Sequence, residues 1–131
     1  MADSYEKPRP LTPTIYNARI VACDTMPFHW RVSPKNPDGM TVRLVVSLLA
    51  DDGPATVTDA VDASNLQRLT SVYTSTGSDA PPFDSLMGDI HNLRGQACVI
   101  ATKNITPRMG RGAGIEKAVI SRWLEPQEAI T

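Results

Sequence analysis

Residues 40–62 read Met-Thr-Val-Arg-Leu-Val-Val-Ser-Leu-Leu-Ala-Asp-Asp-Gly-Pro-Ala-Thr-Val-Thr-Asp-Ala-Val-Asp and contain the clearest structural pattern in the chain. Over residues 40–49 apolar side chains recur at every second position, which is the spacing of a β-strand with one buried face. The turn signal Asp51-Asp52-Gly53-Pro54 follows, and the next eight residues are rich in Thr and Val. The segment therefore predicts a β-hairpin, although Asp59 and Asp62 interrupt its second strand, residues 55–62.

The residues before this hairpin predict one more strand and two irregular segments. Residues 14–23 alternate in the same way, so they are expected to form the first strand. Pro8, Pro10 and Pro13 make residues 1–13 an extended N-terminal arm. Residues 24–39 hold three further prolines and a turn at Asn36-Pro37-Asp38-Gly39, which predicts a loop of roughly 14–16 residues that is either functional or mobile.

The residues after the hairpin predict two short helices. Ser64 followed three residues later by Gln67 matches a capping box, so a helix is expected over residues 65–74. A flexible loop follows over residues 75–82. A second helix is expected from Asp84 to Gly95, with its apolar side chains on one face at Leu86, Ile90 and Leu93.

Two more strands complete the expected fold. The apolar run 96–102 is too short for a buried helix and predicts a central strand, and residues 115–124 predict the last strand. Five strands with one helical insertion between strands 3 and 4 is the order of an OB-fold barrel, which we expect over residues 14–124 of this mainly β chain. Residues 125–131 are then a C-terminal tail. A small α+β sheet domain would give a similar order and remains the alternative.

Length and composition restrict the class of protein. The chain has 131 residues, a net charge of -1 and 41% hydrophobic residues, which fits a single globular domain. It has no apolar run of about 18 residues, and its polar N-terminus lacks the apolar region of a secretion signal, so a cytoplasmic protein without a membrane span is expected. Cys23 and Cys98 are expected to be buried and reduced. With His29 and His91 isolated from them, we expect no bound metal and no cofactor.

Charge is distributed unevenly along the chain. From Lys7 to Arg43 there are six bases and two acids, and from Lys103 to Arg122 there are five bases and one acid. The middle of the chain, residues 51–89, has seven acids and one base. In the OB arrangement the first two and last two strands lie around one side, so we expect one basic face and one acidic face.

Two predicted loops carry the residues best suited to binding. Residues 104–114, Asn-Ile-Thr-Pro-Arg-Met-Gly-Arg-Gly-Ala-Gly, combine three glycines with two arginines, which suits either phosphate contact or a mobile hairpin turn. Residues 24–39 contain Phe28-His29-Trp30-Arg31 and Lys35. Exposed rings beside cations bind single strands by stacking on bases, whereas the alternative is that Phe28 and Trp30 fold back to plug one end of the barrel. In an OB fold both loops flank the face that binds oligonucleotides.

Three segments also carry a resemblance to a known family. Asn36-Pro37-Asp38-Gly39-Met40-Thr41-Val42 leads into the second strand, Leu93-Arg94-Gly95-Gln96-Ala97-Cys98-Val99 into the fourth, and Val119-Ile120-Ser121-Arg122-Trp123-Leu124 ends the last. With these segments, residues 14–124 resemble the small OB-fold single-stranded-DNA-binding proteins, especially the divergent phage and mobile-element type. The resemblance implies non-catalytic binding and protection of single strands, by a homo-oligomer. Residues 125–131 differ from the long acidic tail of cellular members, which puts partner recruitment through a tail in doubt.

We therefore expect a protein that binds single-stranded nucleic acid, with single-stranded DNA as its ligand, in phage or plasmid replication or recombination. The alternative is a non-catalytic protein-interaction or assembly module, in which the acidic half of one copy meets the basic half of another. An enzyme is not expected, because the acid pairs Asp51–Asp52 and Asp59–Asp62 would have to converge with groups from other elements. The expected nucleic-acid contacts are Arg19, Phe28, Trp30, Arg31, Lys35, Arg43, Lys103, Arg108, Arg111, Lys117 and Arg122.

Overall fold

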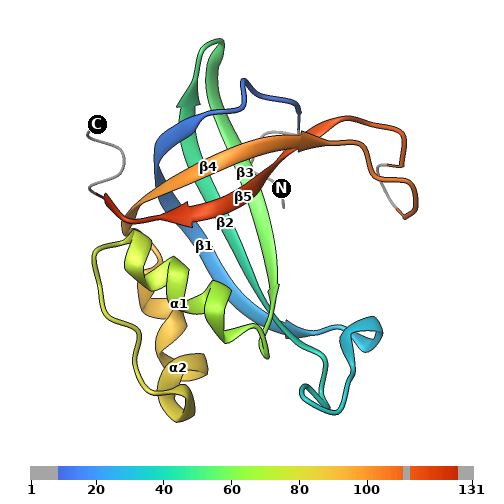
Figure 1. Ribbon diagram of the computed structural model, residues 1–131, viewed down its shortest axis with the longest axis vertical. Helices are drawn as coiled ribbons and strands as arrows, with labels where there is room; N and C mark the ends of the chain where they lie inside the picture. Colours follow the sequence, from blue (N-terminus) through green and yellow to red (C-terminus); the bar gives the residue numbers. More distant parts are fainter. Residues whose placement is uncertain (1–8, 111–112, 127–131) are drawn as a thin grey trace, which may run out of the picture.

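The computed structural model describes residues 9–110 and 113–126 (Figure 1). Five strands form one antiparallel sheet in the order β3-β2-β1-β4-β5. The predicted mainly β architecture of five strands, with helices between the third and fourth, is confirmed. In chain order the elements are β1 (Ile15–Pro27), the 3-10 turn η1 (His29–Arg31), β2 (Met40–Ala50), β3 (Gly53–Asp62), α1 (Leu66–Ser75), α2 (Phe83–Asp89), the 3-10 helix η2 (Ile90–Leu93), β4 (Ala97–Ile105) and β5 (Lys117–Leu124).

Strand β1 belongs to both halves of the sheet. Residues 18–27 pair with β2, and residues 15–19 pair with β4. A bulge between Ile20 and Ala22 shifts the alternation, so that Ile20 is buried and the next buried side chain is Cys23. The prediction ended this strand at residue 23 because the prolines of residues 24–39 indicate a loop. Residues 24–27, predicted as loop, are strand and pair with residues 40–43 of β2.

The core lies between the inner face of the curved sheet and the helices, which Figure 1 shows together at the lower left. Leu44 of β2, Leu69 of α1 and Ile90 of η2 are all fully buried, and burying a side chain of this size contributes about 1.5–3 kcal/mol. Helix α1 is also fastened to β4 by hydrogen bonds. The buried Ser75 hydroxyl donates to the Val99 carbonyl at 2.8 Å and accepts from the Val99 amide at 2.9 Å.

The helix starts differ from the predicted ones. Asn65, not Ser64, caps α1, because its side-chain oxygen accepts from the Arg68 amide at 3.2 Å. The Ser64 hydroxyl instead donates to Asp62 at 2.6 Å. Helix α2 starts after Pro82 with no side-chain cap, so Asp84 does not have its predicted role. The predicted apolar face is confirmed, since Leu86, Ile90 and Leu93 are all buried.

Strands β3 and β5 are the edges of the sheet, and within the described residues no backbone ladder joins them. The predicted closure into an OB-fold barrel is therefore not confirmed. The two edges nevertheless approach each other and are bridged by side chains. Asp59 of β3 accepts from Trp123 Nε1 of β5 at 2.8 Å and from Arg68 Nε of α1 at 2.9 Å. Arg68 Nη2 donates to the Ile120 carbonyl of β5 at 2.7 Å. We call Asp59, Arg68 and Trp123 the seam.

Residues 9–12 of the predicted N-terminal arm also contact both edges of the sheet, close to the β2–β3 turn. The Arg9 carbonyl accepts from the Ala118 amide of β5 at 2.9 Å, and its guanidinium donates to the Asp52 carboxylate at 2.7 and 2.8 Å. This hydrogen bond lowers the pKa of Asp52. Leu11 is buried, and its backbone is held on both sides by the Asn104 amide at 2.8 and 3.0 Å. Arg9 also donates to the Pro54 carbonyl of β3 at 3.1 Å, so the segment links β3 to β5 at the end of the sheet away from the helices.

Candidate nucleic-acid interface

The β1–β2 loop, residues 28–39, is closed at its base by a backbone hydrogen bond. The Phe28 amide donates to the Gly39 carbonyl at 2.8 Å. Gly39 has a φ of 64°, and a Cβ atom there would lie 2.0 Å from the Phe28 carbonyl oxygen. Only glycine fits this position, because a side chain would both strain the backbone and collide with the opposite end of the loop.

Asn36 anchors the middle of this loop to the sheet. Its buried side chain donates to the Met40 carbonyl at 2.8 Å and to Asp62 at 2.9 Å, and accepts from the Met40 amide at 2.9 Å. Asp62 in turn accepts from Ser64, and this hydrogen bond is the main reason that the pKa of Asp62 is lowered. The loop is thus held against β2 and β3 by a satisfied buried amide, which favours a fixed conformation.

Phe28 and Trp30 stack on each other in this loop. Their ring centroids lie 4.5 Å apart with an interplanar angle of 16°, and the His29 ring meets Trp30 edge-on at 5.1 Å. Trp30 is 67% exposed and Phe28 is half-buried. The alternative that Phe28 and Trp30 fold back to plug one end of the barrel is therefore wrong for Trp30. Its indole is supported from behind by Phe28 and presents its ring system to solvent.

Several of the predicted cationic contacts are used within the chain. Arg31 donates to the Ala60 carbonyl of β3 at 3.2 Å, which holds the β1–β2 loop on that edge strand. Arg19 donates to the Gly95 carbonyl. Arg43 forms an ion pair with Asp24 on the neighbouring strand at 2.9 Å. Lys35 is exposed and has no hydrogen bond or ion pair within the described residues. Of these four, Lys35 therefore keeps its charge most available for a ligand.

A second group of predicted contacts lies on the outer face of β4 and β5. Cys98 and Ile100 of β4 belong to the core, so the alternating position of Lys103 faces outward. Lys103 is opposite Val119 in the register. Lys117 and Arg122 are opposite Ile105 and Ala101, also on the outer side. We call Lys103, Lys117 and Arg122 the β4–β5 cation group.

The described parts of the β4–β5 loop, residues 106–110 and 113–116, project at the upper right of Figure 1, and the β1–β2 loop lies at the lower right. Both are thus on the side of this view away from the helices. Arg108 is exposed, whereas Arg111 lies outside the described residues, so its predicted proximity to Trp30 is not tested. Gly110 and Gly114 have φ values of 79° and 80°, and the Gly114 amide donates to the Pro107 carbonyl at 2.8 Å.

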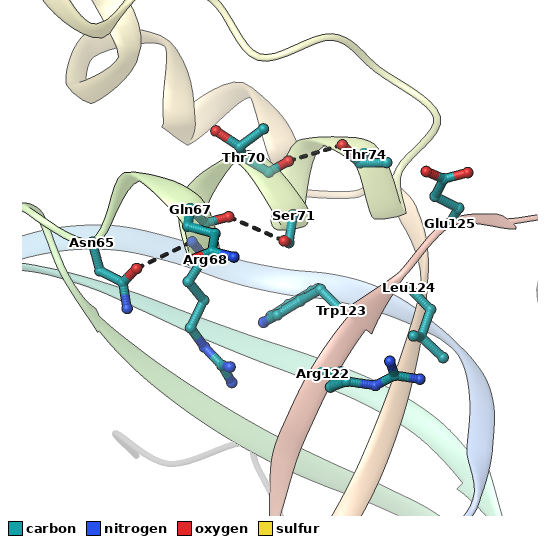
Figure 2. Close-up of a pocket in the computed structure, with 10 residues that line it drawn as sticks. All are labelled: Asn65, Gln67, Arg68, Thr70, Ser71, Thr74, Arg122, Trp123, Leu124 and Glu125. Atoms are coloured by element: carbon teal, nitrogen blue, oxygen red, sulfur yellow. Dashed lines mark hydrogen bonds between the residues drawn. The ribbon is translucent and has the colours of Figure 1, made fainter.

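A polar groove of about 520 Å³ lies between α1 and the end of β5 (Figure 2). Trp123 points from β5 toward Arg68, whereas Arg122 points away from that pair. The Ser71 and Thr74 hydroxyls on α1 donate to carbonyls of their own helix at 3.0 and 3.1 Å. These hydroxyl protons are therefore already in use, and the groove offers Arg122 at its rim as a charged donor.

The seam was missed by sequence reasoning, although a signal for it exists. Asp59 falls between Val57 and Val61 in the alternation of β3, and both valines are buried core residues. A carboxylate in a core position requires hydrogen-bonding partners. The sequence analysis identified Asp59 only as an interruption of the strand. Its partners Arg68 and Trp123 could not be identified, because no local pattern links them to Asp59.

The carboxylates considered for catalysis each have a separate structural partner. Asp59 belongs to the seam and Asp62 to the anchor of the β1–β2 loop. Asp51 accepts from the Thr12 hydroxyl at 3.0 Å, and Asp52 binds Arg9. No group of three His, Cys, Asp or Glu side chains suited to holding a metal occurs among the residues that the structure places.

Both thiols are expected to be unreactive in the folded protein. Cys23 and Cys98 are buried as predicted, and burial raises the pKa of each to about 12. The thiolate is the reactive form, and at pH 8 only about one thiol in 10⁴ would carry it. We expect almost no reaction with a disulfide reagent such as DTNB at pH 8 in buffer, and reaction of two thiols per chain in guanidinium chloride. Rapid native modification of either cysteine would contradict the burial described here.

No protein-family model matches the chain, and no curated protein matches it in sequence. Among the described residues, no helix is long and apolar enough to cross a membrane.

Proposed function

We propose that this protein binds single-stranded nucleic acid, with single-stranded DNA as the ligand, and that it does so without catalysis. The observation that carries the proposal is the exposed Phe28–Trp30 stack, fixed on the β1–β2 loop. An indole that stacks on a second ring and is 67% exposed is suited to stacking on a base. Such stacking is worth about 1–3 kcal/mol per base and tolerates any sequence.

The surroundings of the stack support the same proposal. The loop is held on β2 and β3 by Asn36 and Arg31, so little conformational entropy is lost when a base stacks on it. Lys35, in the same loop, supplies a charge for the phosphate backbone. We further propose that the fold is an OB-type barrel in which the seam takes the place of the β3–β5 ladder, and that the protein acts in phage or plasmid replication or recombination.

A titration of the protein with (dT)₃₀ tests the proposal. Trp30 fluorescence should be quenched on binding, because the exposed indole comes to stack on a base. The logarithm of the association constant should fall linearly with the logarithm of the salt concentration, by about 0.7 per phosphate contacted. A parallel titration with (rU)₃₀ ranks DNA against RNA. If neither oligonucleotide changes the fluorescence or the mobility of the protein at low salt, the proposal is wrong.

An assembly module is the second candidate, and exposed apolar side chains on the β4–β5 loop favour it. Met109 is 85% exposed and Ile115 is 62% exposed. Exposed apolar side chains mark protein contacts when they form a patch. If assembly is the function, the mass measured by sedimentation depends on protein concentration and does not respond to added (dT)₃₀.

A further inference from the structure

The strand register gathers three cations that are dispersed in the sequence. Lys103 lies opposite Val119, one diagonal step from Lys117 and close to Arg122, which follows the bulge in β5. Diagonal neighbours on adjacent strands are about 7–8 Å apart, within reach of long side chains. The β4–β5 cation group therefore forms one surface of like charge.

No carboxylate faces this group from the paired positions. The residues opposite Lys103, Lys117 and Arg122 are Val119, Ile105 and Ala101, all uncharged. The nearest acids along the chain are Glu116, next to Lys117, and Glu125, which lines the same groove as Arg122; both lie outside β5 and neither is paired with a member of the group in the register. None of the three cations makes an ion pair within the described residues. Like charges at such spacing repel one another, and an anionic ligand would remove that repulsion.

The shape of the surface indicates which kind of anion fits. Lys117 and Arg122 are separated by five positions along β5, about 16 Å at the usual rise of a strand. Val119 lies on the outer face between them, and Ala101 lies opposite Arg122 on β4. Exposed Arg108 lies in the β4–β5 loop beyond the Lys117 end. A line of cations over small side chains suits an extended chain of phosphates better than a single compact anion.

We propose that the β4–β5 cation group binds the phosphate backbone of a single-stranded nucleic acid, as a second contact region separate from the Phe28–Trp30 stack. This inference rests on the proposed function and adds the path of the bound nucleic acid over the protein surface. One part of a bound strand stacks on the β1–β2 loop, while another part crosses the outer face of β4 and β5 toward the β4–β5 loop.

The test compares the triple variant Lys103→Ala, Lys117→Ala, Arg122→Ala with the natural chain, using fluorescein-labelled (dT)₃₀ at several salt concentrations. Loss of three phosphate contacts should reduce the salt slope by about 2 and weaken binding on the order of 100-fold at 0.1 M salt. Trp30 quenching at saturation should remain. Arg94→Ala is the matched control, since Arg94 is an exposed arginine in the η2–β4 turn, and it should leave the slope unchanged.

A charge-retaining variant separates charge from shape. Lys103→Arg with Lys117→Arg should keep the salt slope of the natural chain. An unchanged slope in the triple variant, together with Trp30-dependent binding, would overturn the second contact region while leaving the proposed function in place. Loss of self-association without any change in (dT)₃₀ binding would assign the surface to a contact between copies of the chain and would also overturn the inference. If the natural chain binds no oligonucleotide, both proposals fail.

Discussion

Asp59→Ala is expected to lower the free energy of unfolding by about 2–4 kcal/mol, the largest loss we predict for a single substitution that removes no apolar side chain. The Asp59 side chain is 13% exposed and that of Arg68 is 28% exposed. Removing the carboxylate leaves a partly buried guanidinium without its counter-charge and the Trp123 indole N–H without an acceptor. Because these contacts cross from β3 to β5, their loss also weakens the connection between the two edges of the sheet.

Urea denaturation followed by circular dichroism measures this loss. Asp24→Ala is the matched control, because Asp24 pairs with Arg43 at the same N–O distance of 2.9 Å but both side chains are about 40% exposed. An exposed pair of this kind contributes about 0–1 kcal/mol. Asp59→Asn should fall between the two, since its amide oxygen can still accept from Trp123. Equal losses for Asp59→Ala and Asp24→Ala would mean that the seam has no special part in stability.

Trp30→Ala is expected to weaken single-strand binding by roughly 10- to 100-fold, which corresponds to the loss of one stacked base. The free energy of unfolding should change little, because Trp30 is mostly exposed and its aromatic contacts among the described residues are with Phe28 and His29 of its own loop. Fluorescence anisotropy with labelled (dT)₃₀ gives the affinity, and urea denaturation gives the stability. A stability loss of several kcal/mol with unchanged affinity would assign Trp30 a structural role.

Trp30→Phe is the control for two things: the need for an aromatic ring at this position, and the origin of the fluorescence change. It keeps an aromatic face, so most of the affinity should remain. It also leaves Trp123 as the sole tryptophan of the chain. Trp123 is buried and its N–H is bound to Asp59, so its fluorescence should respond little to added oligonucleotide. Strong quenching in Trp30→Phe would place the ligand near the seam instead of the β1–β2 loop.

The strands were largely predictable because their patterns are local. Residues 40–62 form the expected hairpin, with β2 and β3 paired from Thr41–Asp62 to Ala50–Gly53. The apolar run at 96–102 was correctly assigned as a central strand, although β4 continues to Ile105. Errors occurred where a local signal competes with tertiary pairing. The prolines of residues 24–39 predict a loop, whereas residues 24–27 continue β1 by pairing with β2. The predicted α1 cap is one residue early because Ser64 and Asn65 both suit a cap.

The candidate site was predictable as a list of residue types but not as an arrangement. The sequence located the rings at Phe28 and Trp30, yet it left open whether they point into the core. Their exposure depends on how Asn36 and Gly39 fix the loop on the sheet. The sequence also treated Arg31 and Arg43 as free cations, whereas tertiary contacts give each an internal partner.

By itself the sequence determined the order of five strands and two helices, the burial of both cysteines and the loop that carries the aromatic rings. Those features follow from interactions between residues close in the chain, through side-chain alternation and turn formation. Only the tertiary structure decided that Asp59, Arg68 and Trp123 meet between the edge strands β3 and β5. It also decided that Lys103 lies beside Lys117 and Arg122. Such contacts join residues 9 to 64 positions apart, and their partners are selected by strand register and sheet curvature, which no local pattern encodes.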